Sequence, residues 1–202
     1  MKKRTAIAFV SFAVSAASLG IFSAHQDIGI TPKKGDARYI AAKDEYIVTG
    51  GGANMWFGAD AFQYVYKQIS GDVTLTADAH FEGKGVEAHR KAALMIRQTL
   101  DPDSAYADVA LHGDGLTSLQ YREAAGATTL EVRSDVNAPD TIRIQRHGDQ
   151  FTIAVAKRGE PLKSSGPVTV KLHDPVYIGV AVCSHNADVL ETAVFSNLKI
   201  EQ

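Results

Sequence analysis

Apolar and polar residues alternate in short runs along the chain from Tyr39 onward, and turn residues separate the runs. Such alternation is typical of half-buried β-strands, because successive side chains of a strand point to opposite faces of its sheet. No window of ten or more residues shows a clean helical period. The pattern predicts an all-β fold of about a dozen antiparallel strands, arranged as a two-sheet jelly-roll sandwich. The predicted strands cover residues 45–50, 62–69, 72–81, 91–99, 106–112, 116–123, 128–133, 140–148, 150–157, 167–173, 176–185 and 192–202.

The segment 106–123 predicts one hairpin in residue-level detail. Val109 on its first strand and Leu119 on its second belong to the apolar face, and residues that lie opposite each other share a face. The numbers of paired residues must then sum to an even total. This excludes a two-residue loop and favours the three-residue loop Gly113-Asp114-Gly115, with Gly115 in the left-handed conformation. The expected pairs are Val109–Leu119, Asp108–Gln120, Ala110–Ser118 and Tyr106–Arg122.

The other face of this hairpin carries planar or forked polar groups. The preceding strand extends that face, because Ala92, Leu94 and Ile96 belong to the core and place their neighbours opposite. Small residues in the middle would leave room for a ligand above the sheet, and these are Ala93, Ala110 and Ser118, with Gly179, Ala181 and Cys183 on a later strand. The candidate ligand-binding residues are Lys91, Arg97, Tyr106, Asp108, His112, Gln120 and Arg122. The alternative is a solvated sheet face, on which an ion pair of Asp108 with an arginine would contribute under about 1 kcal/mol.

The first 24 residues differ in character from the rest. Lys2, Lys3 and Arg4 precede an uncharged run, which predicts a secretory signal peptide over residues 1–24 and hence a secreted or periplasmic protein. The small residues 15–17 suit signal cleavage, whereas a cut after Ala24 places a phenylalanine three positions back. The alternative is an uncleaved membrane anchor. We expect a linker or N-terminal arm over 25–38 and one β-sandwich domain over 39–202.

Composition narrows the set of partners. The chain has 202 residues, 45% of them hydrophobic, and a formal net charge of −2, which gives no basic footprint for nucleic acid. After signal cleavage no membrane span remains. The single cysteine, Cys183, lies in an apolar run, so we expect a buried, unreactive thiol.

Three segments together resemble the concanavalin A-like lectin/glucanase jelly roll. They are GANMWFGADAFQYVYKQISGDVTLTADAHF, HRKAALMIRQTLDPDSAYADVALHGDGLTSLQYRE and VYIGVAVCSHNADVLETAVFSNLKI, and the resemblance covers roughly residues 40–202. It is strongest to a bacterial subgroup whose members occur alone or attached to TolB-type β-propeller proteins of the cell envelope. The resemblance implies two curved sheets with a concave, glycan-binding face. It also places Trp56 near a sheet edge, where the indole would stack on a sugar or pack on the rim, so Trp56 joins the candidate ligand-binding residues.

Three functions remain open. Glucanases of this fold carry closely spaced acidic residues on one strand, of the Glu-x-Asp-x-x-Glu kind, and this sequence has no such cluster. The acidic candidates are Asp108, Asp114 and Glu123, but the register turns Glu123 away from Asp108. Asp108 beside Arg97 and Arg122 would be held ionised, which suits a ligand anchor. We therefore expect a non-catalytic, carbohydrate-binding module, for which acidic glycans should be tested beside neutral ones. The alternatives are an envelope protein-interaction module of a TolB-like system and a glycoside hydrolase-like enzyme.

No cofactor is expected. Gly50-Gly51-Gly52 lacks the strand–helix context of a phosphate-binding loop, and His89, His112 and His185 lack zinc-like spacing. The segment from His185 to Asp188 is compatible with a calcium loop, but an Asx-stabilised turn is the simpler interpretation. We therefore assign no metal site.

Overall fold

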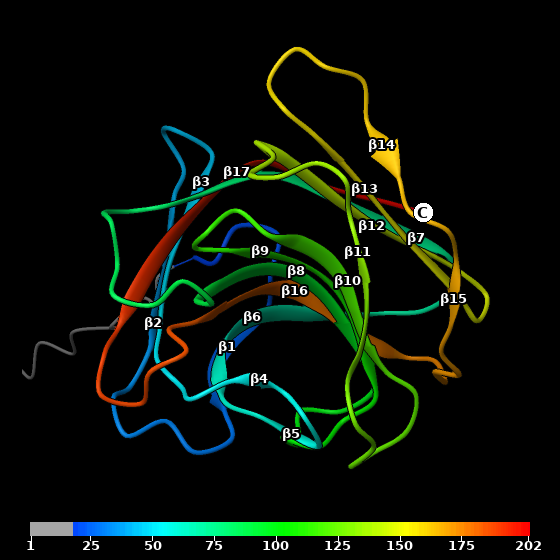
Figure 1. Ribbon diagram of the computed structural model, residues 1–202, viewed down its shortest axis with the longest axis horizontal. Coiled ribbons are helices and arrows are strands. Elements are labelled where there is room, and N and C mark those ends of the chain that lie inside the picture. The colour runs from blue at the N-terminus through cyan, green and yellow to red at the C-terminus, as the bar shows by residue number, and fades with distance from the viewer. Residues whose placement is uncertain (1–17) are drawn as a thin grey trace, which may run out of the picture.

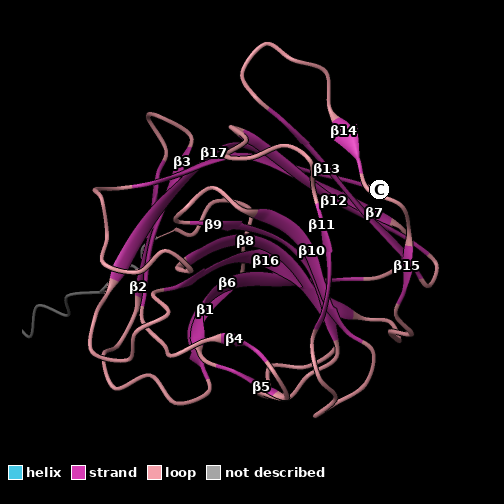
Figure 2. Cartoon of the chain, viewed as in Figure 1, coloured by secondary structure: helices cyan, strands magenta, loops and turns pink. Residues whose placement is uncertain are grey.

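Two antiparallel sheets are stacked face to face in the computed structural model, which describes residues 18–202 (Figure 1). The part of the predicted signal peptide before Ser18 lies outside the described residues. Figure 2 shows strands joined by loops, and no membrane-spanning helix is found among the described residues. Sheet A runs in the order β1 (Ala24–Ile28), β6 (Phe62–Ile69), β16 (Val176–Cys183), β8 (Lys91–Arg97), β9 (Tyr106–His112), β10 (Thr117–Arg122) and β11 (Leu130–Arg133).

Sheet B arches over one face of sheet A (Figure 1). Its order is β14 (Lys163–Ser164), β13 (Gln150–Ala156), β12 (Thr141–His147), β7 (Val73–Phe81), β17 (Glu191–Glu201), β3 (Glu45–Gly50) and β2 (Asp36–Ile40), and β15 (Val168–Thr169) also pairs with β13. A separate two-stranded hairpin, β4 (Met55–Trp56) and β5 (Ala59–Asp60), lies on the opposite side of sheet A (Figure 1). The prediction of a two-sheet antiparallel sandwich is confirmed.

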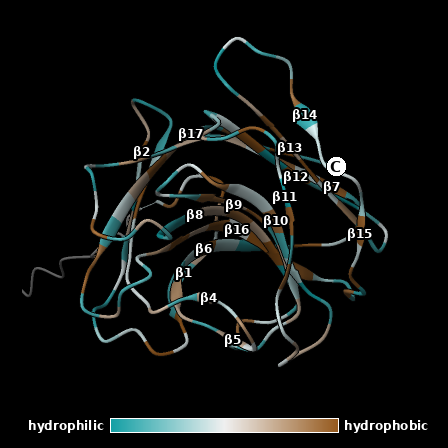
Figure 3. Cartoon of the chain, in the orientation of Figure 1, coloured by the Kyte–Doolittle hydropathy of each residue, from teal (hydrophilic) through white to brown (hydrophobic). Residues whose placement is uncertain are grey.

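The core lies between sheets A and B. Alternate residues of both sheets meet there, and the apolar colouring in Figure 3 follows interior strands such as β13 and β16. Fully buried members include Val48, Leu75, Leu94, Val109 and Phe151. Burial of apolar side chains stabilises the fold by roughly 25 cal/mol per Å² removed from water. The alternation in the sequence therefore reports directly on which residues face the partner sheet.

The predicted hairpin forms with the predicted register. Val109 lies opposite Leu119, and Gly113-Asp114-Gly115 makes the turn. Gly115 has a φ of 91°, a conformation that a side chain would disfavour. The pairs Arg97–Tyr106 and Ala93–Ala110 join β8 to the same patch, so the polar face is continuous across three strands. Local turn chemistry and the facing of apolar residues were sufficient to predict this part of the sheet.

The N-terminal segment is part of the sandwich rather than a linker. The range 25–38, expected to be a linker or arm, contains most of β1 and the start of β2, which pair with β6 and β3. The segment before β1 also packs on the fold, because Phe22 is 6% exposed and contacts the ring of Tyr46 edge-on at 5.2 Å between centroids. The Ile21 backbone N–H donates to the Tyr46 hydroxyl at 2.9 Å. Strands this short show little periodicity, and pairing with a long neighbouring strand determines them.

Candidate functional site

The predicted polar side chains do share one face of sheet A, the face turned away from sheet B. We call it the concave face, and on β8 it carries Lys91, Ala93, Met95 and Arg97. Cross-strand pairing places Lys91 beside His112 at one end. The other end carries the row of Arg97, Tyr106 and Arg122, and small residues lie between the two ends. This is the arrangement that the sequence predicted, but the face is not open to solvent along its whole length.

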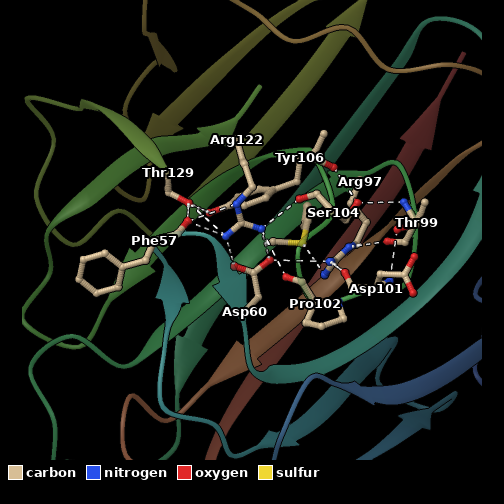
Figure 4. A network of polar contacts seen from close by, with 12 residues as sticks. Phe57, Asp60, Arg97, Thr99, Asp101, Pro102, Ser104, Tyr106, Arg122 and Thr129 are labelled. Atoms are coloured by element: carbon tan, nitrogen blue, oxygen red, sulfur yellow. Dashed lines mark hydrogen bonds and ion pairs between the residues drawn. The ribbon is translucent and has the colours of Figure 1, made fainter. Parts of the chain in front are cut away.

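The hairpin β4–β5 covers one end of the concave face, and a buried ion pair fastens it there (Figure 4). Two guanidinium nitrogens of Arg122 donate to the two carboxylate oxygens of Asp60, at 2.7 and 2.9 Å. The Arg122 guanidinium also donates to the carbonyls of Phe57, Ser104 and Ala127 at 3.0 Å each. Both charged side chains are fully buried. The nitrogens of the Arg122 guanidinium therefore already donate to oxygens of the protein. The sequence had predicted that they would contact a ligand.

Arg97 and Tyr106 belong to the same network. Arg97 donates to the carbonyls of Thr99 and Asp101 at 2.7 and 2.5 Å, and it lies 3.7 Å from Asp60. The Tyr106 hydroxyl is 3.2 Å from the Thr129 hydroxyl oxygen. Both predicted ligand residues are fully buried, so in this structure they hold the covering loops and do not reach solvent.

Asp108 is fully buried in the middle of the concave face. Neither of its carboxylate oxygens has a hydrogen-bond partner in the described part of the chain. Burial raises the pKa of Asp108 well above its usual 3.8, which favours the protonated form. The expectation that Arg97 and Arg122 hold Asp108 ionised is wrong, because both guanidinium groups contact Asp60 instead.

A pocket of about 220 Å³ occupies the other end of the concave face. Four of the predicted ligand-binding residues line it: Trp56, Lys91, His112 and Gln120. The remaining lining residues are Asn54, His89, Leu116, Glu131, Arg133 and His185. Trp56 comes from β4, so the covering hairpin supplies one wall and sheet A supplies the floor.

Hydrogen bonds orient the side chains on the pocket floor. His112 Nδ1 lies 3.0 Å from the Leu116 carbonyl, which can only accept, so Nδ1 carries the proton and Nε2 has a free lone pair. The Gln120 amide nitrogen lies 3.4 Å from that Nε2 and 3.3 Å from the Ser118 hydroxyl oxygen. Because the amide nitrogen faces His112 and Ser118, the Gln120 carbonyl oxygen points away from both. This oxygen has no hydrogen-bond partner in the described structure, although Gln120 is only 1% exposed. Burial, reinforced by the Lys91 charge, lowers the pKa of His112 to about 4, so its ring is neutral at pH 7.

Residues that the sequence analysis did not select complete the rim. Glu131 accepts from Arg133 at 2.7 Å, and both stand on β11 beside Gln120 and Ser118. His89 stacks edge-on with His112 and His185, at 5.8 and 5.6 Å between ring centroids. Extending the predicted register by one strand would have found Glu131 and Arg133. The strand register gives no information on His89 and His185, because they lie in two loops that are far apart in the sequence and meet only in the folded protein.

Two other regions were considered from sequence. Cys183 is fully buried, and burial raises the pKa of its thiol to about 11, in agreement with an unreactive side chain. In the loop from His185 to Asp188, the Asp188 backbone N–H donates to Asn186 Oδ1 at 3.0 Å, which is an Asx turn. Within residues 18–202 no group of three histidine, cysteine or acidic side chains is placed to hold a metal.

No family model and no curated protein matches the sequence. Among solved structures, a functionally unknown protein from Saccharomyces cerevisiae is similar over 87% of this chain and 96% of its own, with a TM-score of 0.64 and 13% identity. The xylan β-1,4-xylosidase from Bacillus halodurans C-125 is similar over 78% of this chain and 33% of its own, with a TM-score of 0.57 and 13% identity. The lectin UEA-II, in complex with galactose, is similar over 87% of this chain and 96% of its own, with a TM-score of 0.54 and 8% identity. The protein therefore has the concanavalin A-like jelly-roll fold.

Proposed function

We propose that the protein is an exported, non-catalytic module that binds carbohydrate in the pocket between Trp56 and Gln120. Two kinds of observation support this function. The fold is shared with a lectin whose structure holds galactose and with a xylosidase, although such likeness does not assign a function by itself. The pocket of this chain combines an aromatic wall, Trp56, with a hydrogen-bonding floor that includes Gln120, and sugar binding uses both kinds of group.

The unpaired carbonyl oxygen of Gln120 is the observation that carries the proposal. An unsatisfied buried acceptor costs about 1–3 kcal/mol, so a native protein rarely keeps one without a ligand or water to satisfy it. This oxygen belongs to a residue that lines the pocket, and the hydrogen bonds of His112 and Ser118 fix its orientation. The oxygen itself is buried, so a hydroxyl group entering the pocket would donate to it after a small rotation of the Gln120 side chain. Sugars supply hydroxyl groups at closely spaced positions.

Trp56 provides the apolar counterpart. Its side chain is half-buried, lines the pocket and stands across from the polar floor. An indole offers a large flat surface with one polar edge, which suits the apolar face of a sugar ring. A wall of this kind and a floor of hydrogen-bonding groups together match the two chemical sides of a sugar.

A glycoside hydrolase-like activity is the weaker alternative. Glycosidases generally use two carboxyl groups that flank the scissile bond. Glu131 is the one acidic residue among the side chains that line the pocket, and it is paired with Arg133. Asp108 is near but fully buried, and Asp114 caps the hairpin turn by accepting from the Leu116 backbone N–H. This distribution favours binding over hydrolysis.

Binding should depend on Trp56 and not on the aromatic residue next to it. We expect a screen of neutral and acidic glycans to identify a ligand, and Trp56→Ala to weaken its binding about tenfold or more, the effect of losing about 1.4 kcal/mol or more. Phe57→Ala is the matched control, because Phe57 is 66% exposed on the same hairpin and does not line the pocket. Isothermal titration with the best oligosaccharide measures both. Equal losses in the two variants, or no glycan bound by the wild type, would refute the site.

A protein-interaction module of the cell envelope, associated with a TolB-like system, is the second candidate. An apolar groove beside the covering hairpin favours it, since Ile30 is 86% exposed there and Pro32 and Pro102 also line the groove. Contiguous exposed apolar surface often marks a contact with another protein. Retention of a specific protein from glycan-free envelope extract, lost in Ile30→Ser, would favour this function over carbohydrate binding.

Export is part of the proposal, and the position of signal cleavage follows from packing. Cleavage after Ala24 would remove Phe22, which is buried against Tyr46. Cleavage after Ala17 keeps Phe22 and places small residues, Ser15 and Ala17, where the peptidase needs them. We therefore expect the mature protein to begin at Ser18, which the intact mass of the exported protein checks. A mature chain that begins at Met1 would rule out signal cleavage, and one that begins after Ala24 would contradict the packing argument.

A further inference from the structure

Lys91 is a buried lysine without a carboxylate in direct contact in the described part of the chain, and burial lowers the pKa of its ammonium group from the usual 10.5. It stands on β8 at the pocket, and the residue is 2% exposed. Its ammonium donates to Asn54 Oδ1 at 3.0 Å and makes a longer contact of 3.5 Å with the His89 carbonyl. No carboxylate lies within 4 Å of the ammonium in residues 18–202. A buried charge normally has a charged partner, because removing it from water is costly.

The neighbouring ionisable groups do not supply the missing negative charge. Glu131 is committed to Arg133, with which it forms an ion pair at 2.7 Å. Asp108 is fully buried without hydrogen bonds, and burial raises its pKa so that the uncharged carboxyl is favoured. His112 is neutral at pH 7. Among the described residues, Lys91 therefore has no carboxylate in direct contact on the wall of the pocket.

The size of the pocket limits what can provide the negative charge. Its volume of about 220 Å³ is below the roughly 300–1,000 Å³ of pockets that hold drug-sized ligands. A single sugar unit is the appropriate occupant, with any further units outside the pocket. Such a unit must donate a hydroxyl proton to the Gln120 carbonyl oxygen and bring an anionic group to Lys91, which has a third ammonium proton beyond its two protein contacts.

We propose that the pocket binds a sugar unit bearing a carboxylate, a uronic acid, and that Lys91 binds the carboxylate. This inference rests on the proposed carbohydrate-binding function and specifies its ligand class. Trp56 then contacts the sugar ring, Gln120 accepts a hydroxyl proton, and Lys91 selects against neutral sugars. A hydrogen bond between charged partners contributes roughly twice as much as one between neutral partners, so the carboxylate determines specificity.

Matched pairs of sugars test the inference. The probes are methyl galacturonide against methyl galactoside and methyl glucuronide against methyl glucoside, titrated into the mature protein and followed by NMR. We expect at least one uronide to bind about tenfold or more tightly than its neutral counterpart, because a hydrogen bond to a charged group is about twice as strong as one between neutral groups. In Lys91→Met, which keeps the length of the side chain, this preference should disappear while binding of the neutral sugar remains. Lys84→Met, at an exposed loop lysine, should behave as wild type.

The outcomes separate this inference from the function on which it rests. Equal binding of neutral and acidic sugars, or a preference that survives in Lys91→Met, overturns the role of Lys91 and leaves carbohydrate binding intact. If a sulfated galactoside binds more tightly than the uronide, the anionic group that the pocket selects is not a carboxylate, and the assignment to a uronic acid is wrong. Failure of every neutral and acidic sugar to bind overturns the carbohydrate function itself. Thermal unfolding of Lys91→Met confirms that the variant is folded, and we expect no loss of stability, because the substitution removes an unpaired buried charge.

Discussion

Replacing Asp60 by alanine will lower the free energy of unfolding by about 3–5 kcal/mol, the usual result of removing one partner of a buried ion pair. The carboxylate of Asp60 is fully buried, accepts two hydrogen bonds from Arg122 and lies 3.7 Å from Arg97. Without it, two buried guanidinium groups would be left without a negative charge. Urea unfolding of wild type and variant, followed by tryptophan fluorescence, measures the change.

An exposed ion pair provides the control for this experiment. Lys43 and Glu45 lie 3.7 Å apart with a largely exposed lysine side chain, so Glu45→Gln should cost under about 1 kcal/mol. Asp60→Asn keeps the shape and one acceptor oxygen, and we expect a loss between those of the other two variants. A change in Asp60→Ala no larger than that in Glu45→Gln would mean that the network does not stabilise the covering hairpin.

The Asp60 ion pair also has a consequence for binding. It fixes β5, and β5 is paired with β4, on which Trp56 stands. The pocket wall is therefore positioned by a charge cluster at the opposite end of the concave face. Asp60 is not among the residues that line the pocket, so we expect its effect on a ligand to pass mainly through the placement of Trp56.

Lowering the pH from 6.5 to 4 will destabilise the protein by about 3 kcal/mol through His112 alone. Its pKa is lowered from 6.5 to about 4 by burial and the nearby Lys91 charge, and one pKa unit corresponds to about 1.4 kcal/mol. Between these values the unfolded chain binds a proton that the folded protein does not bind, so stability falls as the pH falls. Below about pH 4 the ring is protonated in both states and contributes no further loss.

The contribution of His112 is isolated by comparing pH profiles of the unfolding free energy. His112→Asn keeps a donor for the Leu116 carbonyl but does not titrate, so its profile should be flatter than that of wild type between pH 6.5 and 4. Asp108 acts with the opposite sign: its raised pKa makes the folded protein bind the extra proton, so it lowers stability as the pH rises. Asp108→Asn should therefore gain stability relative to wild type as the pH rises above 4. Parallel profiles for wild type and His112→Asn would show that the ring is not held neutral by the fold.

The sequence by itself determined the sandwich and the register of its central hairpin. Alternation assigns each residue to a face, because a strand has a period of two, and Gly113-Asp114-Gly115 leaves one loop length that keeps Val109 opposite Leu119. These are local rules, and they placed Lys91, His112 and Gln120 on the same face correctly. The short strands β1, β2, β4, β5 and β14 escaped prediction because two to five residues show too little periodicity, and the partner of β1 is also distant in the chain.

Only the tertiary structure decided which part of that face remains accessible. A register states where side chains point, but not what covers them. Asp60, on a two-residue strand, takes both Arg122 and Arg97 away from Asp108 and closes one end of the concave face. The other end of the concave face is not fully covered by the hairpin, and the pocket lined by Trp56 lies there. Buried charges must find partners wherever the chain can supply them. Sequence spacing does not reveal that Asp60, on a two-residue strand far from the arginines in sequence, supplies the carboxylate.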